Sequence, residues 1–560
     1  MILSREKQIQ FLQEELKKQT DDFKMKLDSS AVDLLLNKNK LFVAIFVKFM
    51  SNGEMLLKLP ASRPLPRKNE FFYCFTLPES LKRYKDWGNL TYRDLIKRET
   101  KATEVKCIWH GASDDSRFFL AGFKGVSEAF RRYIEQAPGG IVNLGPEVPP
   151  FEYLTNLERV VRSRHPKCDE ILDKDYDAVG FTPLLLDSNK DISQIVQEDY
   201  ISSDIIILQG PPGTGKTTKI SDLCMSLCSM GKSVLVTALT NRALMEVAIK
   251  LQKTEMMKNG DIFKTNLTTD EEKSVHNLMN AETVQPLPGK LMLSTFYLTS
   301  GIAASSFDGP LFDYVIVDEA SQAFLPMLAA ANMLGKKNLW VGDVRQMPPV
   351  VQLPTLRISR MGFSPIIEGL DTVTSSGLFK TYQLTDTYRL GNRAAVFTGI
   401  FYNNTLKSKS ELNGLFENID GPIIVPMKMS KGDHTPKNAI EKAVSLAKDI
   451  LGKSKDAEVA ILSHRTNTTT ALQTEVVRQI GMSKRVLVDT VARVQGITKD
   501  YTIYVIPDTD SKLYSLELRL FNVATSRAII NTYIICPNDV LEFSYMSTEV
   551  RQFLTQLRKK

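Results

Sequence analysis

The chemically most informative stretch of this 560-residue chain is GPPGTGKTT at positions 210–218, between the apolar run IIILQ and a helix-like run. Glycines at this spacing let backbone N–H groups close around phosphate oxygens, and a following helix adds the partial positive charge of its amino end. The pattern therefore predicts a nucleotide site in which Lys216 reaches the β- and γ-phosphates and the Thr217 hydroxyl binds magnesium. The predicted loop residues are Gly210, Pro211, Pro212, Gly213, Thr214, Gly215, Lys216, Thr217 and Thr218.

Two consecutive acids end a second apolar run, VIVDEASQ at 315–322. A strand that ends in this way puts Asp318 at the carboxyl edge of a parallel sheet, where it can hold magnesium. Glu319 can then polarise the water that attacks the phosphate. Paired acids at a strand end can also merely cap the next helix. With the phosphate loop upstream, we interpret the pair as the second half of an ATPase.

Three segments in this order, GPPGTGKT, DEASQA and VGDVRQMPPV, resemble motifs I, II and III of superfamily-1 helicases. They are most similar to the group that includes the nonsense-mediated-decay helicase and the Okazaki-fragment helicase-nuclease. This resemblance implies that Gln346 senses the γ-phosphate and links it to the nucleic-acid side. It also implies an adenine-reading glutamine, for which Gln194 is the first candidate and Gln197 the alternative. Either glutamine could instead be a solvated helix residue.

The later motifs of the superfamily are resembled by LTDTYRL (384–390), VDTVARVQGITKDYTIYVI (488–506) and FNVATSRAI (521–529). The resemblance implies that Tyr388 stacks on the base and that Arg389 meets the γ-phosphate. It further implies that Arg527 is an arginine finger. The matching positions of the middle motif are Gln495, Gly496, Lys499 and Asp500, of which Gly496 is expected at the nucleotide. Cations supplied by a separate domain would stabilise the charge that phosphoryl transfer spreads over the γ-phosphoryl oxygens.

Contacts to nucleic acid are expected from hydroxyls, amides and helix amino ends, which grip the sugar–phosphate backbone without reading sequence. The candidates are Thr240, Asn241, Ser294, Thr295, Arg465 and Thr490. As an alternative, Thr240 or Asn241 is an ordinary helix cap. The sequence departs from the family at SHRTN (463–467), where relatives usually carry Thr-Pro-Tyr and only Ser463 is similar.

The elements that must position these residues fall into two α/β series, with strands expected at 205–210, 233–239, 291–295, 314–320 and 338–343, then at 459–464, 485–491, 501–506 and 532–537. Upstream, residues 4–28 predict an exposed amphipathic helix, and five short strand-like runs predict a small β-barrel. The Pro/Gly-rich stretch 138–150 predicts a linker. The expected fold class is α/β, with two tandem RecA-like P-loop NTPase domains and an N-terminal helical and β-barrel region. The expected domains are residues 1–30, 31–150, 151–180, 181–378 and 379–560.

Composition sets only broad limits. The net charge of +7 is compatible with a polyanionic partner but also with none. The six cysteines and five histidines form no metal-binding pattern, and Cys224 and Cys228 suit one buried helix face. No signal-peptide core or membrane span is readable, so we expect an intracellular, cytoplasmic protein, with the nucleus left open.

The sequence therefore predicts an ATP- and Mg²⁺-dependent helicase or translocase with a monomeric core that acts on single-stranded DNA or RNA. The resemblance implies 5′→3′ movement. One alternative is an ATP-gated nucleic-acid clamp that remodels complexes without separating strands. Another is a regulatory NTPase with no nucleic-acid partner. The barrel's role as a nucleic-acid grip is an analogy from its position in relatives. No Cys/His-rich domain, iron–sulfur pattern or nuclease motif is recognisable.

Overall fold

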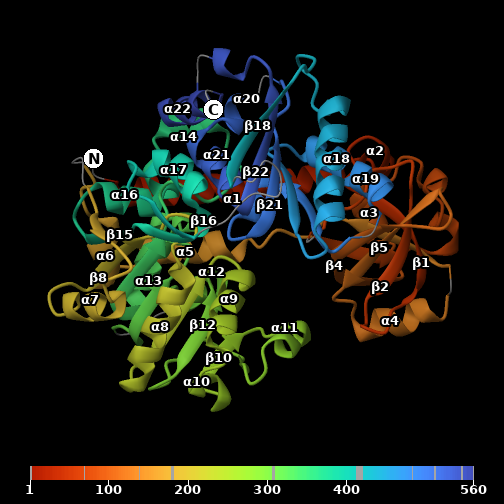
Figure 1. Cartoon of the computed structure of the whole chain (residues 1–560). Helices are drawn as coiled ribbons and strands as arrows, with labels where there is room; N and C mark the ends of the chain where they lie inside the picture. Colours follow the sequence, from red (N-terminus) through yellow and green to blue (C-terminus); the bar gives the residue numbers. More distant parts are fainter. Residues whose placement is uncertain are drawn as a thin grey trace. The chain divides into compact units, whose positions relative to one another are not determined.

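The computed structural model describes residues 3–68, 70–137, 139–177, 182–305, 309–410, 420–481, 483–509, 512–543 and 546–558. The chain divides into two compact units, each made of two stretches of sequence (Figure 1). The first combines Met1–Gln19 with Pro150–Gly421. The second combines Thr20–Pro149 with Pro422–Lys560. In the described residues, no helix is both long enough and apolar enough to cross a membrane.

The first unit is built on a parallel sheet whose described strands follow the order β11-β10-β12-β9-β13-β14-β8-β15-β7 (Figure 1). These strands are β7 (Leu184–Leu186), β8 (Ile205–Gln209), β9 (Val234–Ala238), β10 (Ile262–Thr265), β11 (Met279–Ala281), β12 (Leu291–Thr295), β13 (Phe312–Val317), β14 (Gly335–Gly342) and β15 (Lys380–Leu384). Every residue of β8 and of β9 is buried. Strands covered on both faces read as continuous apolar runs, which is why the sequence revealed the central strands.

Helices cover both faces of this sheet, and each face has its own apolar cluster. One cluster contains residues of α7 (Ile192–Asp199), α8 (Lys216–Ser229) and α9 (Asn241–Leu251). In this cluster Cys224 and Cys228 are buried, as the core-packing interpretation predicted.

The other cluster takes residues from α5 (Glu152–Arg162), α6 (Pro166–Leu172), α12 (Phe296–Ala303) and α13 (Leu325–Leu334). The segment 151–180, predicted as a helical linker, therefore supplies two helices to the core.

The segment after β15 also belongs to the first unit. β15 lies parallel to β8 and extends the first sheet. It leads into β16 (Asp386–Gly391), α17 (Asn392–Gly399), η4 (Ile400–Tyr402) and β17 (Lys407–Ser410). The two compact units divide at Gly421, whereas the sequence placed the domain boundary before residue 379. Chain order alone did not reveal that β15 pairs with a strand far upstream.

The second unit contains a smaller sheet in the order β18-β22-β21-β19-β20. Its strands are β18 (Gly421–Met427), β19 (Val459–Ser463), β20 (Val486–Thr490), β21 (Lys499–Val505) and β22 (Ala528–Pro537). The helices of this region include α18 (Lys437–Lys453), α19 (Thr466–Gln479), α21 (Leu518–Thr525) and α22 (Thr548–Arg558). Two α/β regions with parallel sheets confirm the predicted fold class.

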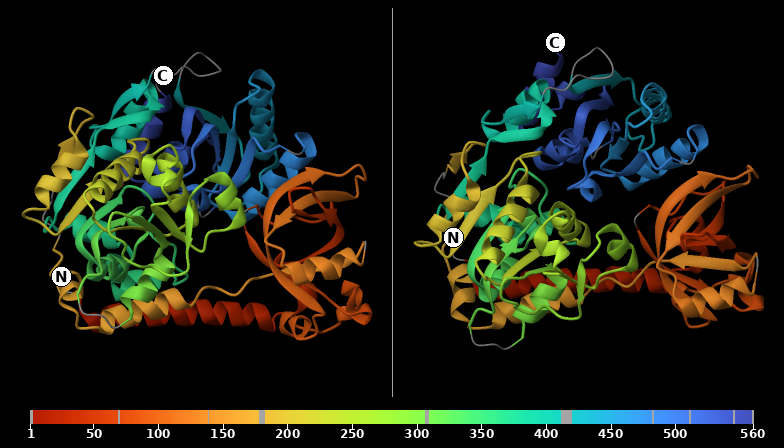
Figure 2. Two further views of the ribbon diagram at one scale, coloured as in Figure 1. Left: turned by 90° about the horizontal axis from the view of Figure 1, so that it is seen from below. Right: turned by 60° about the horizontal axis from the view of Figure 1, so that its bottom comes forward.

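The same unit holds a closed antiparallel barrel in the order β1-β2-β5-β4-β3-β6 (Figure 2). Its strands are β1 (Phe42–Phe49), β2 (Met55–Pro60), β3 (Phe71–Thr76), β4 (Lys101–Ala112), β5 (Phe118–Lys124) and β6 (Ile141–Gly145). The small barrel is as predicted, but β6 lies in the stretch predicted as a linker. Val142 and Leu144 are fully buried, and β6 closes the barrel by pairing with both β1 and β3.

The amino-terminal helix α1 (Arg5–Asp28) has nearly the predicted bounds, but it is not simply an exposed amphipathic helix. Phe11 and Leu12 are buried in the first unit's core, and the polar residues Gln8 and Glu15 are fully buried as well. Its first half lies beside α5, where Gln13 donates a hydrogen bond of 2.8 Å to Glu158 (Figure 2). The apolar periodicity revealed the helix but not these buried polar contacts.

Candidate functional site

The loop between β8 and α8 has the conformation that its glycines allow. Gly213 and Gly215 have φ angles of +76° and +80°, in the left-handed region that favours glycine. Lys216 begins α8, and its Nζ donates to the carbonyl of Gly210. A β-carbon at position 210 would lie 2.3 Å from Cγ of Lys216. The lysine side chain therefore folds back over the loop, and only glycine fits beneath it.

The two acids predicted for catalysis follow β13 at the carboxyl edge of the sheet. Asp318 is 4% exposed, and its burial raises its pKa to about 6 against the opposing charge of Lys216. Burial, with the charges of Asp318 and Glu246, raises the pKa of Glu319 to about 7, while Lys216 and Arg242 oppose the shift. The ammonium of Lys216 thus acts on both carboxyl groups, so these three side chains lie together.

The backbone at Glu319 has an unusual conformation. Its φ angle is +51°, and its N–H donates to Oδ1 of Asp318 over 2.8 Å. A left-handed residue other than glycine costs on the order of 1 kcal/mol, and such strain is typical of functional sites. The turn that follows β13 therefore depends on the side chain of Asp318 as well as on the backbone of Glu319.

Gln346 belongs to a hydrogen-bonded group centred on Asp343. Oδ2 of Asp343 accepts from Nε2 of Gln346 and from the hydroxyl of Tyr402, each over 2.7 Å. A β-carbon at Gly342 would lie 2.8 Å from the backbone nitrogen of Ser321, so this segment packs directly against the turn after Glu319. Asp343 and Tyr402 were missed from the sequence. Asp343 directly follows the apolar strand β14, a position that could have indicated it, whereas nothing in the local sequence indicated Tyr402.

The Tyr-Arg segment in β16 lies directly on the phosphate loop. The hydroxyl of Thr387 donates to the carbonyl of Pro212 over 2.9 Å, and the N–H of Tyr388 donates to the carbonyl of Gly213 over 2.9 Å. A β-carbon at Gly213 would lie 2.5 Å from Cβ of Arg389. Arg389 was predicted in the second α/β domain, but it comes from the same unit as the loop. Thr387 was missed, although it directly precedes the motif.

The two candidate glutamines lie on α7 without a described contact to the loop. Nε2 of Gln194 donates to Glu198 on its own helix over 2.7 Å, on the exposed side. Nε2 of Gln197 donates to Ser226 over 2.9 Å. Ser226 lies near the far end of α8, about 15 Å along the helix from Lys216 at 1.5 Å per residue. The adenine role of Gln194 stays a prediction.

The residues of the first unit that were predicted to contact nucleic acid lie partly at the surface and partly in the core. Thr240 and Asn241 are exposed, and the Thr240 hydroxyl caps α9 by accepting from the N–H of Ala243 over 3.2 Å. Thr295 is half-buried at the end of the neighbouring strand β12. Ser294 is fully buried and bonds to Thr265, so the prediction that it contacts nucleic acid does not fit its position.

In the second unit, Thr490 ends β20 beside Ser463, which ends β19. Arg465 is half-buried at the start of α19, whereas Ser463 is fully buried and donates to the carbonyl of Val505 over 2.9 Å. Thr490 is 8% exposed. At the carboxyl edge of this sheet, Arg465 and a small part of Thr490 are therefore accessible to nucleic acid. Ser463, the residue that is similar to the family, is not accessible.

The other motif residues of the second unit are Arg527, Gly496 and Lys499. Arg527 is 2% exposed, and its Nε donates to the carbonyl of Val523 over 3.1 Å. Gly496 has a φ of +81°. Nζ of Lys499 bonds Glu458 over 2.8 Å at the start of β21, away from the edge that carries Thr490. Lys499 therefore has a structural role.

Comparisons with known proteins agree with this site. Residues 193–352 match the family model described as an AAA domain. The chain is 28% identical over 365 residues to the DNA replication ATP-dependent helicase/nuclease DNA2 of Gallus gallus, covering 61% of this chain and 35% of that protein. It is 30% identical over 243 residues to the protein of the same name from Saccharomyces cerevisiae, covering 40% of this chain and 15% of that protein. The chain thus matches only 15% to 35% of the length of these two relatives.

Among solved structures, the crystal structure of arterivirus nonstructural protein 10 (helicase) is similar with a TM-score of 0.39 and 12% identity, covering 84% of this chain and 77% of that chain. The motifs of the chain resemble those of superfamily-1 helicases, and the matched family model covers the segment that carries the phosphate loop and the two strand-end acids. The curated relatives of the chain are helicase-nucleases of the DNA2 type.

Proposed function

We propose that this protein is an ATP-driven motor that moves along single-stranded nucleic acid and separates duplexes. One observation carries the proposal: Lys216, Asp318 and Glu319 lie together at the phosphate loop, and Arg389 packs against the same loop. A lysine, two strand-end acids and an arginine are the groups that phosphoryl transfer from ATP requires.

In this proposal Glu319 takes the proton of the attacking water. A base works best when its pKa is near the working pH, and the pKa of about 7 for Glu319 meets that requirement. Lys216 and Arg389 stabilise the charge that develops on the γ-phosphoryl oxygens. Arg527 adds a further cation in the role that the family gives it.

Magnesium fits the donor set of the loop. Burial raises the pKa of Asp318 because its charge is poorly solvated, and a divalent cation would favour the charged form. Asp318 and the Thr217 hydroxyl would hold the ion. When bound, Mg²⁺ neutralises charge on the β- and γ-phosphate oxygens.

The strand would be held at Thr240, Asn241 and Thr295 by the first unit, and at Arg465 and Thr490 by the second. Hydroxyls and helix amino ends bind the phosphate backbone whatever the base sequence. We propose DNA as the track to test first, since the curated relatives are named for DNA replication. Movement 5′→3′ is proposed from the same branch of the superfamily.

A second candidate function is an ATP-gated clamp on nucleic acid. Two of the hydroxyls expected to touch the strand, those of Ser294 and Ser463, are fully buried. A chain with fewer contacts to the nucleic acid is better suited to binding a strand in response to ATP than to displacing its complement, and this observation favours the clamp.

The test measures ATP turnover with and without single-stranded DNA or RNA, at several salt concentrations, beside displacement of a labelled strand from a duplex. A motor gives strand-stimulated turnover and ATP-dependent displacement. Stimulation without displacement supports the clamp. If neither single-stranded DNA nor single-stranded RNA changes the rate of ATP turnover, both proposals are contradicted and a regulatory NTPase is supported.

A further inference from the structure

A buried carboxylate outside the nucleotide site, Glu15 on α1, holds two backbone amides of a distant segment. Glu15 is 0% exposed. Its Oε1 accepts from the N–H of Gln352 over 2.8 Å, and its Oε2 accepts from the N–H of Leu353 over 3.0 Å. Nε2 of Gln19 donates to the same Oε1 over 2.8 Å. Three N–H donors therefore bond this one carboxyl group, which fixes the position of the two backbone amides.

The two amides belong to the chain segment that leaves the Gln346 motif. They follow Gln346 by only a few residues and precede α14 (Thr355–Met361). At its other end the segment is fixed by the bond between Gln346 and Asp343. Since Glu15 binds main-chain N–H groups, it sets the path of the backbone whatever side chains the segment carries. The γ-phosphate-sensing glutamine is therefore tethered on both sides.

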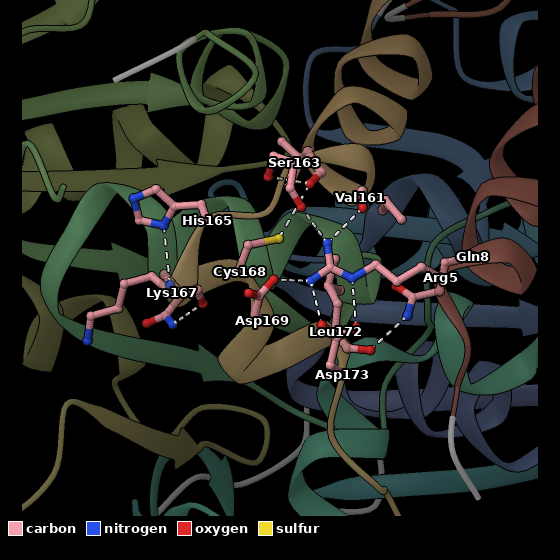
Figure 3. Close-up of polar contacts among 12 residues, drawn as sticks. Arg5, Gln8, Val161, Ser163, His165, Lys167, Cys168, Asp169, Leu172 and Asp173 are labelled. Carbon is pink, nitrogen blue, oxygen red and sulfur yellow. Dashed lines mark hydrogen bonds and ion pairs between the residues drawn. The ribbon is translucent and has the colours of Figure 1, made fainter. Parts of the chain in front are cut away.

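Glu15 can hold the two amides in place only if α1 itself is fixed. The start of α1 is bonded, through Arg5, to residues in and next to α5 and α6 (Figure 3). Nη1 of Arg5 donates to the carbonyls of Val161 and Ser163 over 2.8 and 2.6 Å. Its guanidinium also pairs with Asp169 and with Asp173, the latter over 2.7 Å. A neutral residue at position 5 would leave two carboxylates without this partner. These contacts of Arg5 fix the rotation of α1 about its axis and its position along that axis.

The next turns of α1 pack on rings from the site's own surroundings. The ring of Phe11 lies 5.4 Å from that of Phe324 and 5.4 Å from that of Phe363, measured between centroids. Phe324 follows the turn that contains Glu319, and Phe363 follows α14. The helix therefore contacts both chain segments that lead away from the catalytic motifs.

α1 is continuous from Arg5 to Asp28, and its last residues belong to the second compact unit. We propose that Glu15 is a positioning residue for the Gln346 segment, and that α1 conveys changes in the second unit to that segment. Stimulation of ATP turnover by nucleic acid then depends on the Glu15 carboxylate. This inference rests on the proposed motor or clamp function.

The test compares the full chain with Glu15→Gln and with Glu14→Gln as the matched control. Glu14 is the adjacent residue, and its carboxylate pairs at the surface with Arg357 of α14 over 2.6 Å. The same chemical change there removes an ion pair to the same segment but leaves the buried amide bonds intact. Turnover is measured over a range of ATP concentrations, with and without a single-stranded DNA oligonucleotide, together with thermal unfolding.

We expect Glu15→Gln to lower the factor of stimulation by DNA about fivefold, within the range seen for residues that couple two sites. The KM for ATP without DNA should change less than about twofold, because the phosphate loop is untouched. Glu14→Gln should match the wild type in both. Glu15→Asp, which keeps the charge but shortens the reach, should lose stimulation similarly and replaces Glu15→Gln if that variant does not fold.

Normal stimulation in Glu15→Gln, beside a stimulated wild type, overturns the inference and leaves the proposed function standing. Equal losses in Glu15→Gln and Glu14→Gln, in step with lower thermal stability, also overturn it, since they indicate general loosening of α1. A wild type that single-stranded nucleic acid does not stimulate removes the proposed function, and this inference falls with it.

Discussion

The motif residues of the two compact units differ in their surroundings. In the first, Lys216, Asp318 and Glu319 share one electrostatic environment, and Arg389 is packed onto the loop that Lys216 closes. In the second, Arg527 is buried just after α21 and donates to the carbonyl of Val523 on that helix, and Lys499 is paired with Glu458. The first unit thus presents an assembled set of groups for ATP, whereas the second holds its motif residues within its own packing.

The difference shows what each unit can do by itself. A preorganised set of charges needs little rearrangement to bind and polarise a triphosphate. Arg527 is 2% exposed, so it must become accessible before it can act on a phosphate. In the proposed function, nucleotide binding therefore belongs to the first unit, and Arg527 of the second unit affects the rate at which bound ATP turns over.

The largest effect is expected from replacing Arg527, which tests whether the second unit supplies a catalytic cation. Arg527→Ala should lower kcat about a thousandfold, the scale of losing an arginine finger, while ATP affinity changes little because the loop is intact. Steady-state turnover and binding of a fluorescent ATP analogue measure the two quantities. Arg527→Lys is the control for packing, and it should fold normally yet remain slow. Turnover near the wild-type value in Arg527→Ala would show that the second unit supplies no catalytic cation there.

The second effect sharpens the role of the first unit. Glu319→Gln should bind ATP and nucleic acid normally but hydrolyse ATP at least about a hundredfold more slowly, the scale of losing a proton-transfer group. Single-turnover hydrolysis separates this chemical step from product release. If the hydrolysis step keeps its rate, Glu319 is not the base.

A third effect concerns packing between the loop and β16. Gly213→Ala places a methyl group 2.5 Å from both Arg389 Cβ and Thr387 Oγ1, whereas a methyl group at Gly215 meets nothing within 4 Å. Both positions have positive φ, so strain is common to the two variants. We expect Gly213→Ala to lose about 1–3 kcal/mol more unfolding free energy than Gly215→Ala. Denaturant unfolding without nucleotide measures the difference, and equal losses would argue against tight contact with β16.

The smallest expected effect is a pH dependence from Glu319. Its pKa of about 7 in the folded chain lies above the ordinary value of 4.5. Between these values the folded chain binds more protons than the unfolded chain, so this residue's contribution makes stability fall as pH rises. Above pH 7, Glu319→Gln should be more stable than the wild type by about 1–3 kcal/mol, and the gap should shrink toward pH 4.5. Unfolding curves without nucleotide test this, and a constant gap at every pH would contradict it.

The sequence indicated the phosphate loop and the strand-end acids because the signals for them are local. The phosphate loop and the acids at 318 and 319 each sit at the end of an apolar strand, and such ends meet at one sheet edge. The pairing of β15 with β8 is not local, so nothing in the sequence indicated that Arg389 lies in the same compact unit as the phosphate loop. Tyr402 was missed for the same reason.

The candidate contacts to nucleic acid were harder to predict, because a hydroxyl at the end of a β-strand can either face solvent or form hydrogen bonds within the core. Thr240 caps a helix and remains exposed, while Ser294 and Ser463 turn into the core. Their sequence contexts are alike, and only the packing of neighbouring strands separates them. The barrel was recognised from alternating apolar residues, but its closing strand β6 was hidden by flanking glycines and prolines.

The central claim, that ATP binding in the first unit is coupled to the grip on a strand, is tested most directly by strand affinity in defined nucleotide states. Fluorescence anisotropy would give the Kd of the Glu319→Gln chain for a single-stranded DNA oligonucleotide without nucleotide, with ADP and with ATP. We expect the Kd with ATP to differ from the other two values by at least about fivefold, the lower end of typical coupling between sites. Equal Kd values in all three states would contradict it.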